Sequence, residues 1–138
     1  MEKTLHMVLG NTIFFAAVCN MILALSVARS DATMARVMKW SHSVGVVWAG
    51  RLVILMGIGM VMRFKGVYLS SAMGFAWQGW VSILLWAPVE IMAKRMVRPD
   101  LDVVMDGGDA SSRLAMGSGI QLLVVTVIIG LMHSITPT

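Results

Sequence analysis

The chain has 138 residues, of which 58% are hydrophobic and only 13% are charged. Soluble domains are nearer to about 45–50% apolar and about 25% charged. A fold of this size cannot hide such an excess of apolar residues, so a soluble protein, including a soluble enzyme, is excluded. The composition predicts an integral membrane protein whose partner is the lipid bilayer.

The net charge of +4 does not indicate a nucleic-acid partner. The basic residues flank apolar runs, as cytoplasmic membrane anchors do, and we expect no nucleic acid to bind. The single cysteine, Cys19, lies in an apolar run and has no second cysteine with which to form a disulfide within the chain. It is expected to pack as a small hydrophobic residue.

The first apolar run, from Leu5 to Ala28, is longer than the roughly 7–15-residue core of a signal peptide and predicts a first membrane span. The segment after it, Arg29 to Lys39, mixes basic and apolar residues, so we expect it to lie along the membrane surface. A second span follows over 43–62 and a third over 71–92. Pro88 is expected to kink the third span and to free a backbone carbonyl near Glu90.

A polar link, 94–112, separates the third span from the fourth, and its end, Asp109 to Ser112, offers N-cap residues. The predicted fold is therefore all-α, with a single domain over 1–138. It is an integral membrane bundle of four transmembrane helices, with spans at about 5–28, 43–62, 71–92 and 113–133. A helix needs about 20 apolar residues to cross a bilayer, and each span has that length.

Lysine and arginine are unevenly distributed over the predicted links. The links after spans one and three hold seven of them, and the opposite side holds three. By the positive-inside rule, the first and third links face the cytoplasm and both termini lie on the same, outer side.

Each predicted span carries one polar residue at a similar depth, and one of these residues is a full charge, Arg51. The others are Asn20, Glu90 and Gln121. Arg51 and Glu90 differ by about 7 Å in depth, which long side chains can bridge. Two interpretations are open. The group forms a polar site for an anion or for protons, or it is a structural ion pair with interhelical hydrogen bonds.

Two histidines mark the outer ends of the bundle, His6 in the first span and His133 in the last. Histidines on facing helices can hold a haem iron, and together with Met7 and Met132 they could suit copper. Alternatively, both are interfacial residues at span ends, like the tryptophans of an aromatic belt. His42 is predicted to be a surface group or helix cap at the inner interface.

Small residues predict close helix packing in the second span. Gly50 and Gly57 are seven residues apart and share a helix face. Such residues let membrane helices approach one another closely.

The chain resembles the HemJ and CopD-like group of small four-span membrane proteins. The resemblance rests on Leu5-His6 at the start of span one, on Gly79-Trp80 in span three and on the basic pair Lys94-Arg95 that follows. It implies a four-helix core that binds haem, with His6 as a ligand, or a protein that handles copper. The family's proline–arginine stretch and the lysine after its Gly-Trp pair are absent, since Ser26–Arg29 and Val81–Ile83 stand there.

Two functions follow as expectations. The first is a redox-associated membrane protein that binds haem b, or alternatively copper, at His6 and His133, with Arg51 holding an acidic group of the cofactor. The second needs no cofactor: a small transporter or channel, or a non-enzymatic accessory subunit of a larger membrane complex. The short chain favours a homo-oligomer or a complex. The expected location is a bacterial inner membrane, which the protein crosses several times.

Overall fold

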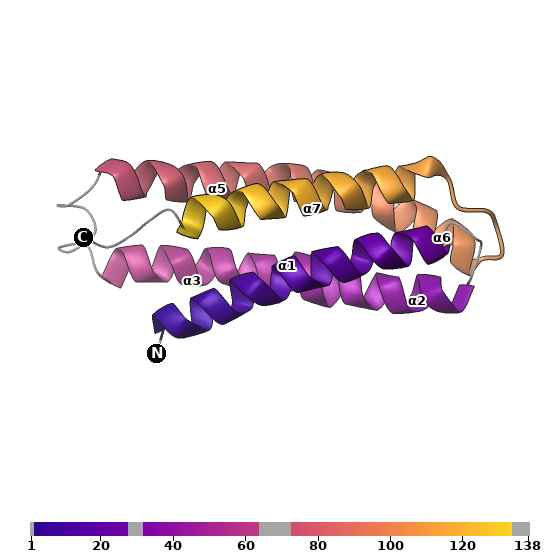
Figure 1. The fold of residues 1–138 in the computed structure, drawn as a ribbon, viewed down its shortest axis with the longest axis horizontal. Helices are drawn as coiled ribbons and strands as arrows, with labels where there is room; N and C mark the ends of the chain where they lie inside the picture. Colours follow the sequence, from indigo (N-terminus) through magenta and orange to yellow (C-terminus); the bar gives the residue numbers. More distant parts are fainter. Residues whose placement is uncertain (1, 28–31, 64–72, 134–138) are drawn as a thin grey trace.

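The computed structural model of the protein describes residues 2–27, 32–63 and 73–133. These residues form long helices that lie side by side, and they contain no strand (Figure 1), so the predicted all-α bundle is confirmed. The start of the first helix and the end of the last lie at the same end of the bundle. The elements are α1 (Glu2–Val27), α2 (Ala32–Ser41), η1 (His42–Trp48), α3 (Ala49–Arg63), α5 (Met73–Met92), η2 (Ala93–Val97), α6 (Arg98–Met105) and α7 (Ser112–His133).

Two of the helices are longer than the predicted spans. α2, η1 and α3 follow one another without a break, as do α5, η2 and α6, and the η segments are wide π-helical turns. At 1.5 Å per residue the helix over 32–63 is about 48 Å long, whereas the hydrocarbon core of a bilayer is about 30 Å thick. One end of this helix therefore extends beyond the hydrocarbon.

This extension corrects two predictions. The described part of the segment predicted to lie on the membrane surface, Ala32–Lys39, continues the second span as a helix. It does so because Ala35 and Met38 are buried in the bundle. The predicted polar link 94–112 is likewise helical as far as Met105, and only a short connection leads to α7.

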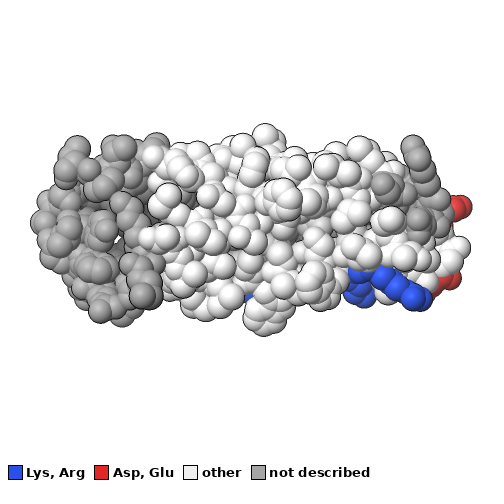
Figure 2. Space-filling model, turned by 60° about the horizontal axis from the view of Figure 1, so that its bottom comes forward, with Lys and Arg blue, Asp and Glu red and all other residues white. Residues whose placement is uncertain are grey.

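Charged side chains gather at the α2–α6 end, and the middle of the face shown in Figure 2 is nearly free of them. At this end the Lys39 Nζ donates to Asp102 Oδ1 at 2.6 Å and joins α2 to α6. Within the described ranges, three helical segments are long and apolar enough to cross a membrane: Thr4–Leu25, Ala32–Gly59 and Ser112–His133. The protein is thus a multi-pass membrane protein whose charged end lies outside the hydrocarbon.

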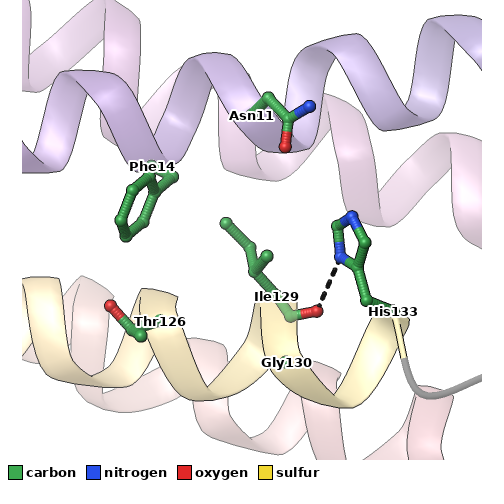
Figure 3. Close-up of a pocket in the computed structure, with 6 residues that line it drawn as sticks. All are labelled: Asn11, Phe14, Thr126, Ile129, Gly130 and His133. Carbon is green, nitrogen blue, oxygen red and sulfur yellow. Dashed lines mark hydrogen bonds between the residues drawn. The ribbon is translucent and has the colours of Figure 1, made fainter.

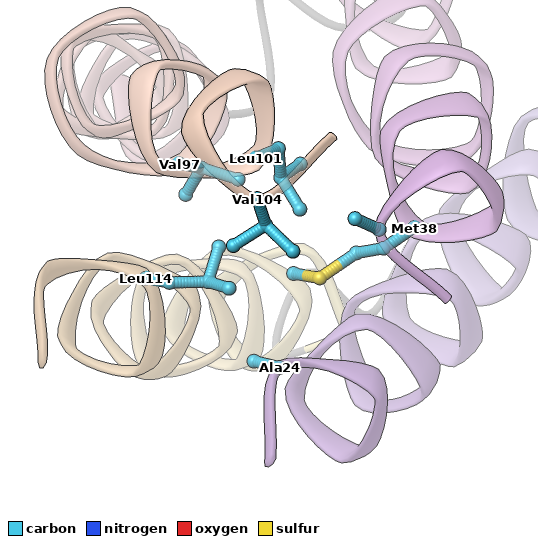
Figure 4. Packing of buried hydrophobic residues seen from close by; sticks show 7 residues of the cluster. Ala24, Met38, Val97, Leu101, Val104 and Leu114 are labelled. Atoms are coloured by element: carbon cyan, nitrogen blue, oxygen red, sulfur yellow. The ribbon is translucent and has the colours of Figure 1, made fainter. Parts of the chain in front are cut away.

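Two apolar clusters fill the bundle. The cluster at the charged end brings all four helices together, and its side chains point toward a shared centre (Figure 4). The second cluster lies further along the bundle axis. The first consists of Ala24, Ala35, Met38, Val97, Leu101, Val104 and Leu114, and the second of Ile13, Ala17, Val46, Ala49, Trp86, Val89 and Val125.

The connection from α6 to α7 is held by a buried carboxylate. α6 ends in a left-handed glycine, Gly107, with φ 89°, and the Gly108 N–H donates to the Val103 carbonyl at 2.8 Å, which closes the helix end. Asp100 Oδ2 then accepts from the Ser111 hydroxyl at 2.7 Å and from the Leu114 N–H at 3.0 Å. The predicted capping stretch thus supplies Ser111, and Asp100 satisfies an amide at the start of α7.

α3 and α5 approach closely where a glycine meets a tryptophan. A Cβ atom built on Gly50 would lie 1.9 Å from the Trp86 ring, and the ring is itself buried. Only a residue without a side chain fits here, in line with the small-residue prediction for this helix.

Replacing this glycine tests the close approach. In Gly50→Ala the new methyl group must displace the buried Trp86 ring, so we expect the protein to lose about 1–3 kcal/mol of stability. The measurement is thermal unfolding in detergent. Gly59→Ala in the same helix is the matched control, because no atom of the described residues lies within 4 Å of a Cβ there. Equal melting temperatures for the two variants would show that the Trp86 ring does not pack on Gly50.

Candidate functional site

A layer of buried polar residues lies between the two apolar clusters. On each contributing helix, the polar residue stands between members of the two clusters along the chain. Asn20 comes between Ala17 and Ala24, and His42 comes between Met38 and Val46. α7 supplies the other two polar residues, Ser118 and Gln121. The exposed fractions of all four side chains are between 1% and 2%.

One hydrogen-bonded chain crosses this layer. The Gln121 amide Nε2 donates to the Val89 carbonyl at 2.9 Å, which leaves its Oε1 to face His42 Nε2 at 3.0 Å. Because an amide oxygen only accepts, His42 Nε2 carries the hydrogen and donates it. The chain joins η1, α7 and α5, and the accepting carbonyl lies one residue beyond Pro88 in the long helix.

The structure therefore corrects the prediction for His42. It was expected to be a surface group or a cap, but its side chain is only 1% exposed and is bonded inside the bundle. The reason is the helical extension: because α2 continues past the expected end of the span, the chain around His42 lies in the interior. The amide atoms of Asn20 and the hydroxyl of Ser118 are buried and have no hydrogen-bond partner within the described part of the chain.

The second polar group is an ion pair between α3 and α5. Arg51 Nε donates to Glu90 Oε1 at 2.8 Å, and Arg51 Nη2 donates to Glu90 Oε2 at 2.9 Å, the two-pronged geometry that favours arginine with carboxylate. The Trp86 indole N–H points at Glu90 Oε1 at 3.4 Å. The Arg51 guanidinium also lies 5.1 Å from the centre of the Trp48 ring, within reach of a cation–π contact.

This pair lies on the side of the bundle rather than in its core. The Arg51 side chain is 40% exposed and the Glu90 side chain 21% exposed. Arg51 is twelve residues from Lys39 and twelve from Arg63 along one helix, or about 18 Å from each. It is therefore near the middle of the membrane. The structure joins Arg51 to Glu90 and Gln121 to His42, and no hydrogen bond joins Asn20 to either pair.

At the end of the bundle away from α2 and α6, His133 lines a groove of about 400 Å³ between α1 and α7. His133 Nδ1 lies 2.9 Å from the Ile129 carbonyl. Since a carbonyl only accepts, Nδ1 carries the hydrogen and Nε2 keeps a free lone pair. Figure 3 shows the ring standing up from α7 toward Asn11 on α1. The lining residues are Asn11, Phe14, Thr126, Ile129, Gly130 and His133.

His6 lies elsewhere on α1. Its ring is near Gly57, where a Cβ would be 3.6 Å from His6 Cε1, and its buried Nδ1 has no hydrogen-bond partner among the residues that the structure describes. Five helical residues separate His6 from Asn11, a turn of about 140° around the axis. His6 is not among the groove residues. In the part of the chain that the structure describes, no three His, Cys, Asp or Glu side chains gather into a metal site.

Comparison with protein-family models, with curated proteins and with solved structures found no match to this chain.

The buried layer can be tested at Gln121. In Gln121→Leu the His42 donor and the Val89 carbonyl lose their partner inside the bundle, so we expect a loss of about 1–3 kcal/mol in the free energy of unfolding. Thr126→Val is the control on the same helix, because its exposed hydroxyl donates within that helix, to the Leu122 carbonyl at 2.7 Å. Thermal unfolding of both variants in detergent measures the difference. A Gln121→Leu protein as stable as the control would mean that the layer contributes nothing to packing.

Proposed function

We propose that the protein is a non-enzymatic integral membrane subunit that works in an assembly, in which another membrane helix covers the Arg51–Glu90 pair. The observation that carries this proposal is the exposure of that pair on the side of the bundle. A charge at the bilayer centre is expensive and normally faces a partner, a cavity or another charge.

Neither the lipid nor the ion pair itself removes this cost. Arg51 is about 18 Å along the helix from Lys39 and from Arg63, which is further than an arginine side chain reaches to place its charge in water. Pairing with Glu90 offsets part of the cost of taking both ions out of water, but an ion pair in a low-dielectric medium seldom recovers all of it. A further protein surface with polar or aromatic groups would shield both charges from lipid.

The buried layer supports a structural role in preference to a transport path. Asn20, His42 and Gln121 are at most 2% exposed, and apolar clusters close the layer on both sides. Hydrogen bonds such as those of Gln121 with His42 and with the Val89 carbonyl fix helices against one another in membranes. The bacterial inner membrane remains the predicted location.

The mass of the protein in its own membrane tests the assembly. In nanodiscs cut directly from the membrane with a polymer, the total mass of the protein that contains this chain should exceed that of the single 15.0 kDa chain. In Arg51→Ala, Glu90 loses its bonded cation, and we expect a smaller assembled fraction by native mass spectrometry. Arg36→Ala, an exposed arginine near the charged end of the same helix, should leave that fraction unchanged. A wild-type protein that is a single chain in these discs overturns the proposal.

A second candidate function is haem binding, and one observation favours it. His133 Nδ1 is held by the Ile129 carbonyl, so Nε2 is available in a groove lined by Phe14 and Gly130. Metal-binding histidines usually have their second nitrogen fixed in this way. His133 would then supply the protein ligand and the groove the apolar contact, while His6 lies outside it. A bound haem would supply one-electron redox chemistry.

The absorbance spectrum tests this candidate. If haem binds in the groove, the gently purified protein shows a Soret band that His133→Ala removes. His6→Ala should keep the band, because His6 does not line the groove. Metal analysis of the same sample shows whether copper is present instead. A colourless, metal-free protein, or a band that survives in His133→Ala, counts against this site.

A further inference from the structure

A line of exposed side chains follows the long helix α2–η1–α3 over most of its length. Its members succeed one another at steps of three or four residues, which keeps them on one side of a helix. The two successive steps of four fall in and beside η1, where the wider π turn needs more residues per turn. The members, called here the α2–α3 stripe, are Val37, Trp40, Val44, Trp48, Arg51, Leu55 and Ile58.

The stripe is long and unusually well exposed. Its apolar members are between 43% and 70% exposed, and Val37 and Ile58 are about 32 Å apart along the helix. Alternating steps of three and four are the pattern of side chains that interlock between two paired helices. Arg51 is the only charged member of the stripe. In paired helices, a single polar residue at a contact position fixes how the two helices are aligned along their length.

We propose that the α2–α3 stripe is the contact surface between two copies of this chain, related by a two-fold axis along the membrane normal. The proposal rests on the function proposed above, that another membrane helix covers Arg51, and it names that helix as α2–α3 of a second copy.

The membrane itself favours this symmetry. All copies of one chain insert with the same orientation, so two stripes that meet run parallel. In a two-fold contact the same surface is used by both copies, and each residue then meets its counterpart at its own depth. Trp48 would lie against Trp48 of the second copy, where paired aromatic rings add to the contact.

The charges are complementary under the same operation. Each copy brings one guanidinium and one carboxylate, Arg51 and Glu90, to the same depth. Two copies therefore form a neutral group of four charges, in which an Arg51 can also donate to the Glu90 of the other copy. A different protein would have to supply its own polar groups at this depth, whereas a second copy brings them without further requirement.

The exposed face of α5 differs from the stripe, because its exposed side chains are apolar and lipid alone can cover them. On α5, Trp80 is 66% exposed and Leu84 69% exposed, and lipid tails solvate such apolar side chains. Leu84 lies at nearly the depth of Arg51, since Gly50 and Trp86 are in contact across the same two helices. It is therefore a matched control position on a face that we expect to meet lipid.

Cysteine cross-linking in native membranes tests the inference. In a Cys19→Ala background, Val44→Cys and Leu55→Cys should each form a disulfide-linked dimer when the membranes are oxidised. Leu84→Cys and Leu123→Cys lie on α5 and α7 and are at least as exposed as the two stripe positions, and they should form no disulfide-linked dimer. When the Val44→Cys and Leu55→Cys chains are expressed together with different tags, no disulfide should link a chain of one kind to a chain of the other, because the two positions are about 16 Å apart in depth.

The other outcomes separate this inference from the proposed function. Self-cross-linking only at Leu84 or Leu123, or only between Val44 and Leu55, overturns the parallel two-fold contact but leaves an assembled protein. A stripe cysteine that cross-links to a different protein overturns the second copy as occupant and leaves the subunit function standing. No cross-link at any position overturns the inference, and if the nanodisc particle is also a single chain, both proposals fail.

Discussion

The bilayer offers no hydrogen bonds, and the arrangement of this bundle depends on that constraint. Polar groups within the hydrocarbon must be satisfied by the protein itself. The chain meets this demand in two places, the His42–Gln121–Val89 chain inside and the Arg51–Glu90 pair at the side. The first fixes three helices in depth and rotation relative to one another. The second ties α3 to α5 near the middle of the membrane, where Gly50 lets the Trp86 ring fill the space between them.

The two π-helical segments accompany the polar layer. His42 opens η1, and the Val89 carbonyl lies shortly before η2 on the facing helix. A wide turn changes which residues face inward, and such turns are frequent at functional positions. In η1 it turns His42, Val46 and Val47 into the core while leaving Val44 and Trp48 outside. The same local change thus serves the buried hydrogen bond and the exposed α2–α3 stripe.

The fold class follows from composition because apolar runs of this length have one common solution in a bilayer. Glu90 could also be predicted from the sequence as the partner of Arg51. Few charged residues lie inside the apolar runs, and a partner must lie at a similar depth in the membrane. The buried position of His42 could not be predicted from average hydropathy. The helix that carries it begins among charged residues such as Arg36 and Lys39, which lower the average and mark the segment as a link. A signal was present in the spacing of Ala35 with Met38 and of Leu101 with Val104, three residues apart on one face. The rotation of each helix about its own axis could not be predicted from the sequence. In α1 this rotation turns His6 away from the groove that His133 lines.

A bundle of four helices has one narrow core, and here it is already filled. Trp86 occupies the space against Gly50, and the hydrogen-bonded side chains of His42 and Gln121 fill the buried layer. A paired arginine and glutamate at mid-depth therefore lie between two helices at the edge, with Trp48 as a partial cover. A larger bundle could surround such a pair with its own helices. In this bundle the Arg51 side chain stays 40% exposed, which is why we propose that the surface of another protein completes its environment.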